Sequence, residues 1–275
     1  FQAADPKDPA FPIDDLYHLL PANPKEVYDF DEILARLVDG SERLEFRPDD
    51  GPEVFTGVCK IDGRLVGCIG NRQGYLGKGY PEYADYPGMG GKLYRQGLIK
   101  MNEFVTLCGR DRLPIIWFQD TSGIDVGELA EKAEVLGLGQ GLIYSIQQTD
   151  VPMMLVVLRK GTAAAHYVMG GPTANRHNAF SLGTPATEIE VMHGETAAVA
   201  TYARRAAKEQ AAGRSLDPII EKMNALVERY HETSRPAYCA QQGFVDEVVK
   251  LTELRRYLQA FTGAVYQNPT SICPR

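Results

Sequence analysis

The sequence predicts an α/β fold in which helices cover both faces of a sheet. Residues 114–119 and 151–159 are apolar almost throughout, which is typical of strands buried on both sides. Helical patterns separate these runs, so strands and helices alternate along the chain. The 275 residues are 44% hydrophobic and 24% charged, which supplies enough apolar material for a large core.

The first part of the chain is expected to be irregular. Five prolines within residues 1–27 prevent a long helix or strand there. We therefore expect a strap or linker over residues 1–30 and one domain over residues 31–275. The pattern of apolar side chains predicts a short amphipathic helix over 31–38.

A β-hairpin is the clearest local prediction. Residues 54–61 and 64–70 are apolar runs that flank Asp62-Gly63. An Asp-Gly pair favours a two-residue turn because both turn positions need positive φ. The glycine-rich segment 71–91 then reads as a long irregular loop, and loops of this length inside a domain are usually functional.

Further along the chain, glycine and proline positions divide the sequence into alternating elements. In order, we expect a helix over 92–108, a strand over 114–119, a helix over 126–148, a strand over 151–159, a short helix, a strand over 187–192, a helix over 195–211, a helix near 219–230, a last strand within 243–249 and a helix near 254–266.

Charge and hydropathy exclude several functional classes. The formal charge is −7, and residues 1–56 alone hold 14 acidic and 5 basic residues. No dense Lys/Arg stripe exists, so nucleic acid is not an expected partner. The longest apolar run, 151–158, is far shorter than the roughly 20 residues of a membrane span. No basic and apolar leader precedes it, and we expect a cytoplasmic protein.

The cysteines predict neither disulfides nor a metal site. Their number is odd, and no Cys-x-x-Cys or Cys/His ligand spacing occurs. Buried free thiols in a reducing compartment are the expectation. They are Cys59, Cys68, Cys108, Cys239 and Cys273.

Two strand-end loops remain as candidate sites after familiar motifs fail. Leu93 stands where a phosphate-binding loop needs Ser or Thr, and no Gly-x-Ser-x-Gly elbow makes Ser122 a nucleophile. The loops 120–124 and 161–166 consist of small residues after apolar strands, so a ligand oxygen can approach backbone N–H groups. That arrangement is typical of an oxyanion hole. The alternative is that Ala163–Ala165 simply begin a helix.

Long blocks of the sequence resemble a known family. Residues 159–171, Arg-Lys-Gly-Thr-Ala-Ala-Ala-His-Tyr-Val-Met-Gly-Gly, are similar to the signature of biotin-dependent acyl-CoA carboxyltransferases. Residues 120–124 resemble the family's Asp-x-Pro-Gly-Phe motif, with Ser122 and Ile124 as departures. The blocks 91–98, 100–108 and 266–269 resemble the α (carboxyltransferase) subunits of glutaconyl-CoA decarboxylases.

The resemblance implies a crotonase-like spiral of ββα units and only part of an active site. Subunits of this family contain two related halves, and this chain matches the C-terminal carboxyltransferase half. In the family, the N-terminal half of one subunit holds acyl-CoA and the C-terminal half of another holds biotin. We therefore expect a homo-oligomer whose site lies between the two halves.

The resemblance also implies an activity, namely transfer of the carboxyl group of glutaconyl-CoA to biotin to give crotonyl-CoA. The backbone N–H groups of Ala164 and Ala165 would hold the urea oxygen as catalytic donors. The residues expected around biotin are Gly161, Thr162, Ala163, His166, Gly123 and Ile124. No metal and no particular acyl-CoA contact is expected from this chain.

The implied partners extend beyond this chain. Biotin would arrive on a carrier subunit, and the coenzyme A thioester would be bound by the N-terminal half. Membrane decarboxylase subunits of a sodium-pumping complex would place the protein at the inner face of the cell membrane.

Two other functions stay open at this point. A biotin-independent crotonase-type hydratase or decarboxylase would use carboxylates for proton transfer, with Asp120, Asp125 and Glu128 as candidates. The chain is alternatively a dimerisation half-subunit that is inactive alone.

Overall fold

A single mixed sheet organises the part of the chain that the structure describes. The computed structural model describes residues 4–77, 86–172 and 175–267. Within it the sheet order is β1-β2-β3-β4-β5-β6-β8, and β7 pairs with β5 beyond this path. The strands are β1 (Arg43–Glu45), β2 (Val54–Ile61), β3 (Arg64–Asn71), β4 (Ile115–Thr121), β5 (Met153–Thr162), β6 (Asn178–Gly183), β7 (Glu188–Glu190) and β8 (Glu247–Val248).

The sheet has an antiparallel edge and a parallel centre. β1, β2 and β3 pair antiparallel, and every pair from β3 through β8 is parallel. The helices are α1 (Leu16–Leu19), α2 (Phe30–Ala35), α3 (Arg95–Asp111), α4 (Glu128–Lys132), α5 (Val135–Gln148), α6 (Ala163–Val168), α7 (Gly194–Ala211), α8 (Asp217–Ser234), α9 (Pro236–Gln241) and α10 (Leu254–Gln267).

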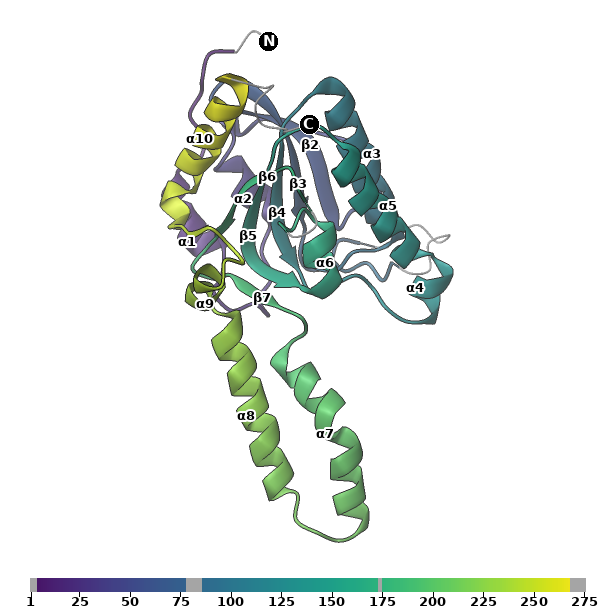
Figure 1. Cartoon of the computed structure of the whole chain (residues 1–275). Helices are drawn as coiled ribbons and strands as arrows, with labels where there is room; N and C mark the ends of the chain where they lie inside the picture. The colour runs from purple at the N-terminus through teal and green to yellow at the C-terminus, as the bar shows by residue number, and fades with distance from the viewer. Residues whose placement is uncertain (1–3, 78–85, 173–174, 268–275) are drawn as a thin grey trace.

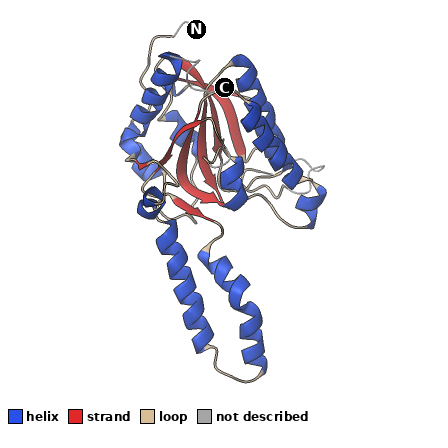
Figure 2. Ribbon diagram, viewed as in Figure 1, coloured by secondary structure: helices blue, strands red, loops and turns tan. Residues whose placement is uncertain are grey.

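Helices cover both faces of the sheet, as the apolar strands predict (Figures 1 and 2). Ile116 and Phe118 of β4 belong to a core with α1, α2 and α10. Ile115 and Trp117 point the other way, into a core with α3 and α5. Because successive side chains of a strand alternate between faces, an unbroken apolar run satisfies both cores.

The predicted hairpin and the irregular first segment are both confirmed. β2 and β3 pair from Val54↔Asn71 to Ile61↔Arg64, and Asp62 and Gly63 both have positive φ. Before residue 30 the described chain has only α1 and a three-residue 3-10 turn. Leu16 of α1 is nevertheless fully buried, so this strap forms part of the first core.

The predicted helix over 126–148 is wrong in one respect, because two helices occupy this range. α4 and α5 meet at Glu134, whose φ is +59°. Arg95 donates a hydrogen bond to the carbonyl of Ala133 at 2.6 Å, which satisfies an acceptor exposed by the break. The periodic pattern continues across the break, so the sequence alone does not reveal it.

The later strands are shorter than predicted, and one strand was not predicted. β7 and β8 have three and two residues inside the predicted ranges. β6 escaped prediction because Asn178 and Ser181 interrupt its apolar pattern. The part of the 71–91 loop at 78–85 and Cys273 lie outside the described residues; Cys59, Cys68, Cys108 and Cys239 are free and buried, as expected.

Helices α7 and α8 form an antiparallel hairpin that projects from the body of the molecule (Figure 1). Each has 18 residues, yet few of their side chains are buried. Within the described ranges, no helix is long and apolar enough to cross a bilayer.

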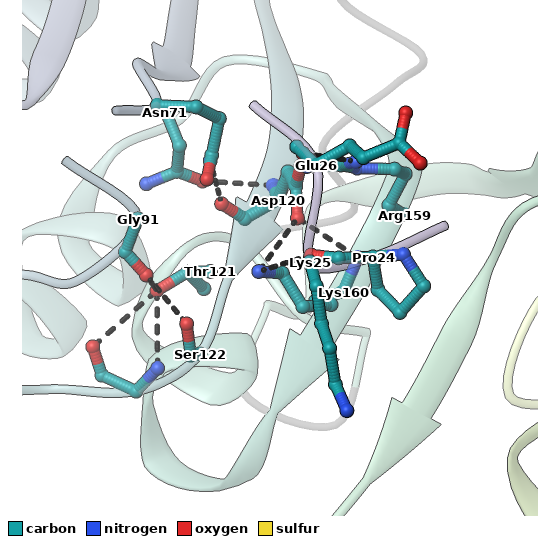
Figure 3. Close-up of polar contacts among 12 residues, drawn as sticks. Pro24, Lys25, Glu26, Asn71, Gly91, Asp120, Thr121, Ser122, Arg159 and Lys160 are labelled. Carbon is teal, nitrogen blue, oxygen red and sulfur yellow. Dashed lines mark hydrogen bonds and ion pairs between the residues drawn. The ribbon is translucent and has the colours of Figure 1, made fainter. Parts of the chain in front are cut away.

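A buried ion pair fastens the strap to the sheet (Figure 3). Arg159 Nε of β5 donates to Asp120 Oδ2 of β4 at 2.8 Å, and both side chains are almost fully buried. Arg159 Nη1 donates to the strap carbonyls of Asn23 and Glu26 at 3.0 and 2.8 Å. Its guanidinium also lies 4.6 Å from the centre of the Tyr28 ring. One arginine therefore joins two strand ends to the strap.

A second buried carboxylate caps the helix that supports the site. Glu53 Oε1 accepts from the N–H of Tyr94, the N-cap residue of α3, at 3.3 Å. Gly97 leaves room for it, since a Cβ there would lie 2.2 Å from the same oxygen. Burial raises the pKa of Glu53 from 4.5 to about 7.

Replacing Arg159 by Met should destabilise the fold by about 3–5 kcal/mol, because Asp120 is left as an uncompensated buried charge. Urea unfolding of the variant and the parent measures this difference. Lys132→Met is the matched control: it breaks an exposed pair with Glu128 and should leave the free energy of unfolding almost unchanged. Equal effects of the two substitutions would contradict the role of Arg159.

Glu53→Gln should change how stability depends on pH. Between pH 4.5 and about 7 the unfolded chain loses the Glu53 proton before the folded chain does, so stability falls as pH rises. The loss is on the order of 3 kcal/mol, and the glutamine variant lacks it. Urea unfolding at about pH 4.5 and about pH 8 checks this, and parallel curves for the two proteins would exclude it.

Candidate functional site

The two predicted loops leave the sheet side by side. β4 and β5 are parallel neighbours, and after a bulge Thr121 pairs with Gly161. Both strands therefore end at the same edge, where ligands collect in open α/β sheets. The following segments, 121–125 and 161–165, are the loops that the sequence singled out.

The first loop is held by backbone hydrogen bonds to residues 91–93. Ser122 N donates to the carbonyl of Gly91 at 2.8 Å, and Asp125 N donates to that of Leu93 at 3.0 Å. Gly123 N donates to Thr121 Oγ1 at 3.3 Å. Among the described residues, the N–H of Ile124 has no acceptor. The loop thus leaves one amide for a ligand.

The second loop presents the start of α6. Ala164 and Ala165 lie in its first turn, where N–H groups have no acceptor within the helix. Ala163 has φ +50°, a left-handed conformation that costs an L residue roughly 1–2 kcal/mol. Thr162, the N-cap residue, is 3% exposed, and its Oγ1 has no partner among the described residues. The N–H groups in the first turn of α6 and the Thr162 hydroxyl are therefore available to a ligand.

Gln119 of β4 positions α6. Its Nε2 donates to the carbonyls of His166 and Met169, so Oε1 faces His166 Nδ1 at 2.6 Å. Burial lowers the pKa of His166 to about 4, which leaves the ring neutral with its proton on Nδ1. Gly161 is required beside this pair, because a Cβ there would lie 2.7–2.8 Å from both atoms.

An apolar cavity of about 1040 Å³ lies in front of the two loops. The apolar cavity is walled by α4, α5 and the segment that leads into α7, and much of its rim is open. Val126 and Leu136 are each 79% exposed, and Val191 is 70% exposed. Side chains this apolar and this exposed are typical of a surface that another molecule covers.

A charged cavity of about 840 Å³ adjoins the apolar cavity, and Ser122 and His193 line both. The strap, the start of α7 and the end of α8 form its walls. Its charged and titratable lining residues are Lys25, Glu26, Lys160, Glu188, Glu190, His193, Glu195, His231 and Arg235.

The structure brings most of the predicted site residues together. Those that line the apolar cavity are Gly123, Ile124, Thr162, Ala163 and Ala164. Gly161, Ala165 and His166 lie directly behind this wall, and His166 Nδ1 is committed to Gln119. The sequence analysis missed Gln119 and the pair of Glu190 with His193. The Glu-x-x-His spacing before a helix was the available signal for that pair.

The carboxylates considered for proton transfer are already engaged. Asp120 is fully buried and paired with Arg159. Asp125 pairs with Lys92 at 3.2 Å, and Glu128 pairs with Lys132 on the exposed side of α4. No group of three or more His, Cys, Asp or Glu side chains suited to a metal occurs in the described ranges.

Sequence comparison identifies the family. The carboxyl transferase domain family matches residues 1–275. The glutaconyl-CoA decarboxylase α subunit of Acidaminococcus fermentans is 60% identical over 276 residues, covering 100% of this chain and 47% of the relative. The methylcrotonoyl-CoA carboxylase β chain of Arabidopsis thaliana is 26% identical and covers 96% of this chain and 42% of its own length. The chain spans about half the length of these relatives.

Solved structures share the fold. The β subunit of Pseudomonas aeruginosa geranyl-CoA carboxylase superposes with a TM-score of 0.82 at 24% identity, covering 99% of this chain and 48% of that one. Transcarboxylase 12S superposes with a TM-score of 0.80 at 23% identity over 100% of this chain and 48% of that one. The expected crotonase-like α/β fold is confirmed. The chain belongs to the carboxyl transferase domain family.

Proposed function

We propose that this chain is the biotin-side half of a carboxyltransferase that moves the carboxyl group of glutaconyl-CoA to biotin and yields crotonyl-CoA. The observation that carries the proposal is 60% identity along the whole chain to a glutaconyl-CoA decarboxylase α subunit. The unused amides at the ends of β4 and β5 supply a chemical reason for it.

The residues present fit a cyclic urea. The N–H groups of Ile124 and Ala164, which line the apolar cavity, would donate to its oxygen, and the unpartnered Thr162 hydroxyl offers a further polar contact. Ala165, the other predicted donor, lies behind the wall of the apolar cavity. The apolar cavity would accept the remaining hydrocarbon and thioether atoms. When bound, biotin supplies the nitrogen that takes the carboxyl group. Fixed amide donors stabilise negative charge that develops on the oxygen.

The open rim of the apolar cavity supports a shared site. Val126, Leu136 and Val191 would be covered by the N-terminal half of a partner subunit, which would also hold the acyl-CoA. Water excluded in this way strengthens each charge interaction inside. Further partners under this proposal are a biotin carrier subunit, other copies of the chain and the membrane subunits of a sodium-pumping complex, which would hold it at the inner face of the membrane.

Ala164→Pro should reduce carboxyl transfer to free biotin by about 10²–10³-fold in the complete enzyme that contains this chain. The substitution removes one donor in the first turn of α6. A steady-state assay with glutaconyl-CoA measures the rate. Leu129→Pro, at the equivalent position of α4 and outside the apolar cavity, is the control and should retain the rate.

An ester bond in place of the Ala164 amide removes the same N–H without the proline ring, and it tests the donor if the proline variant unfolds. Unchanged transfer in either folded variant would exclude Ala164 as a donor. Turnover of crotonyl-CoA without biotin would instead favour a crotonase-type hydratase.

A further inference from the structure

A histidine–carboxylate pair stands at the wall between the two cavities. His193 Nδ1 forms a hydrogen bond with Glu190 Oε1. The Glu190 side chain is 8% exposed, whereas that of His193 is 41% exposed. His193 lines both the apolar and the charged cavity. The Glu190 carboxylate is therefore almost buried, whereas the His193 imidazole is accessible from both cavities.

The sheet sets this pair beside the amide donors. Glu190 is the last residue of β7 and pairs directly with Thr162, the last residue of β5. Ala163 and Ala164 follow Thr162 into the apolar cavity. His193, three residues beyond the end of β7 and at the start of α7, lines the same cavity. The donors and the imidazole therefore share one wall.

The hydrogen bond assigns the ring nitrogens. An ionised carboxylate only accepts hydrogen bonds, so Nδ1 of His193 carries a proton. Nε2 is then the nitrogen that exchanges a proton with a ligand. A carboxylate that fixes the ring in this way is a common partner of histidines that act as acid and base.

Opposing influences act on the pKa of His193. The hydrogen bond that Nδ1 donates to Glu190 raises the pKa of His193 above its ordinary value, and the charge of Glu188 acts in the same direction. Burial, the charge of Lys160 and the N-terminal end of α7 all act against protonation. Glu195 of α7 and His231 of α8 complete the ionisable groups around it in the charged cavity, with Lys25 and Glu26 of the strap and Arg235 after α8.

Other titratable groups of the apolar cavity are less suited to this task. Lys92 is paired with Asp125, and Glu134 lies 3.5 Å from Arg95. Glu131 is exposed on α4. None of these groups also lines the charged cavity.

We propose that His193, oriented by Glu190, carries the proton during carboxyl transfer. As a C–N bond forms at the urea nitrogen, its N–H bond breaks and Nε2 takes the proton. The C–C bond to the departing carboxyl group breaks before the C–N bond forms and leaves its electron pair on the acyl chain, and the imidazolium then returns the proton to that carbon. No net proton is gained or lost. This inference rests on the proposed function.

Nuclear magnetic resonance of the histidine rings tests the inference without turnover. Glu190→Gln should lower the pKa of His193 in a pH titration, and adding biotin or 2-imidazolidinone should shift the ring signals of His193. The signals of His231, which lines only the charged cavity, should move less with either ligand and serve as the internal control.

Activity of the complete enzyme gives the second readout. His193→Ala should lower kcat by about 10²-fold or more with little change in KM, remove one limb of the pH profile, and regain activity on addition of imidazole. His18→Ala, at an exposed residue of α1 outside both cavities, is the matched control and should retain kcat. A merely structural role of His193 predicts neither the change in pH profile nor the rescue.

The outcomes separate the two proposals. If the parent binds biotin and transfers carboxyl groups while His193→Ala keeps kcat and its pH profile, or is not rescued by imidazole, the role of His193 is overturned and the proposed function stands. If the parent neither binds biotin nor transfers the carboxyl group, the proposed function falls and the role of His193 falls with it.

Discussion

The ion pair between Asp120 and Arg159 is the constraint on which the geometry of the site depends. Each of these residues is followed within two positions by a loop that faces the apolar cavity. Asp120 also accepts from the backbone N–H of Lys160 at 3.1 Å, so the two strand ends cannot slide past one another. Arg159 uses its remaining donors on the strap. The buried ion pair therefore fixes the position of the two loops relative to each other.

Small residues then convert this rigid edge into a surface of backbone donors. Gly161 lets Gln119 and His166 approach, and their contact fixes α6. Residues 91–93 fix the other loop through hydrogen bonds that bypass Ile124. In both loops the protein satisfies most amides internally and leaves a few in the cavity. Such preorganisation is what stabilises charge without a nucleophilic side chain.

Local chemistry explains which features the sequence could predict. The Asp62-Gly63 turn and the strands at 115–121 and 153–162 follow from turn geometry and unbroken apolar runs, and these predictions succeeded. The break at Glu134 depends on Arg95, which lies far away in sequence, and a periodic pattern carries no trace of it. The amide loops were predictable because they follow strands directly.

The rest of the candidate site comes from tertiary contact. The walls of the apolar cavity come from α4, α5 and the segment before α7. His193 lies in that segment beside the donors because β7, which precedes it, pairs with the end of β5. The resemblance predicted His166 as a residue around biotin, yet its Nδ1 is used by Gln119, which lies two positions before the end of the buried strand β4. A polar residue within an apolar run, such as Gln119, therefore indicates a side chain that positions neighbouring elements rather than one that contacts a ligand.

Under the proposed function, the two cavities would divide the physical requirements of group transfer. The apolar cavity supplies fixed N–H donors and an apolar wall. The donors stabilise a negative charge most strongly when water is excluded. The other supplies ionisable groups, and Ser122 and His193 connect the two. An apolar wall with side chains 79% exposed does not exclude water by itself. Under the proposed function, a covering partner would therefore have to exclude water from the apolar cavity.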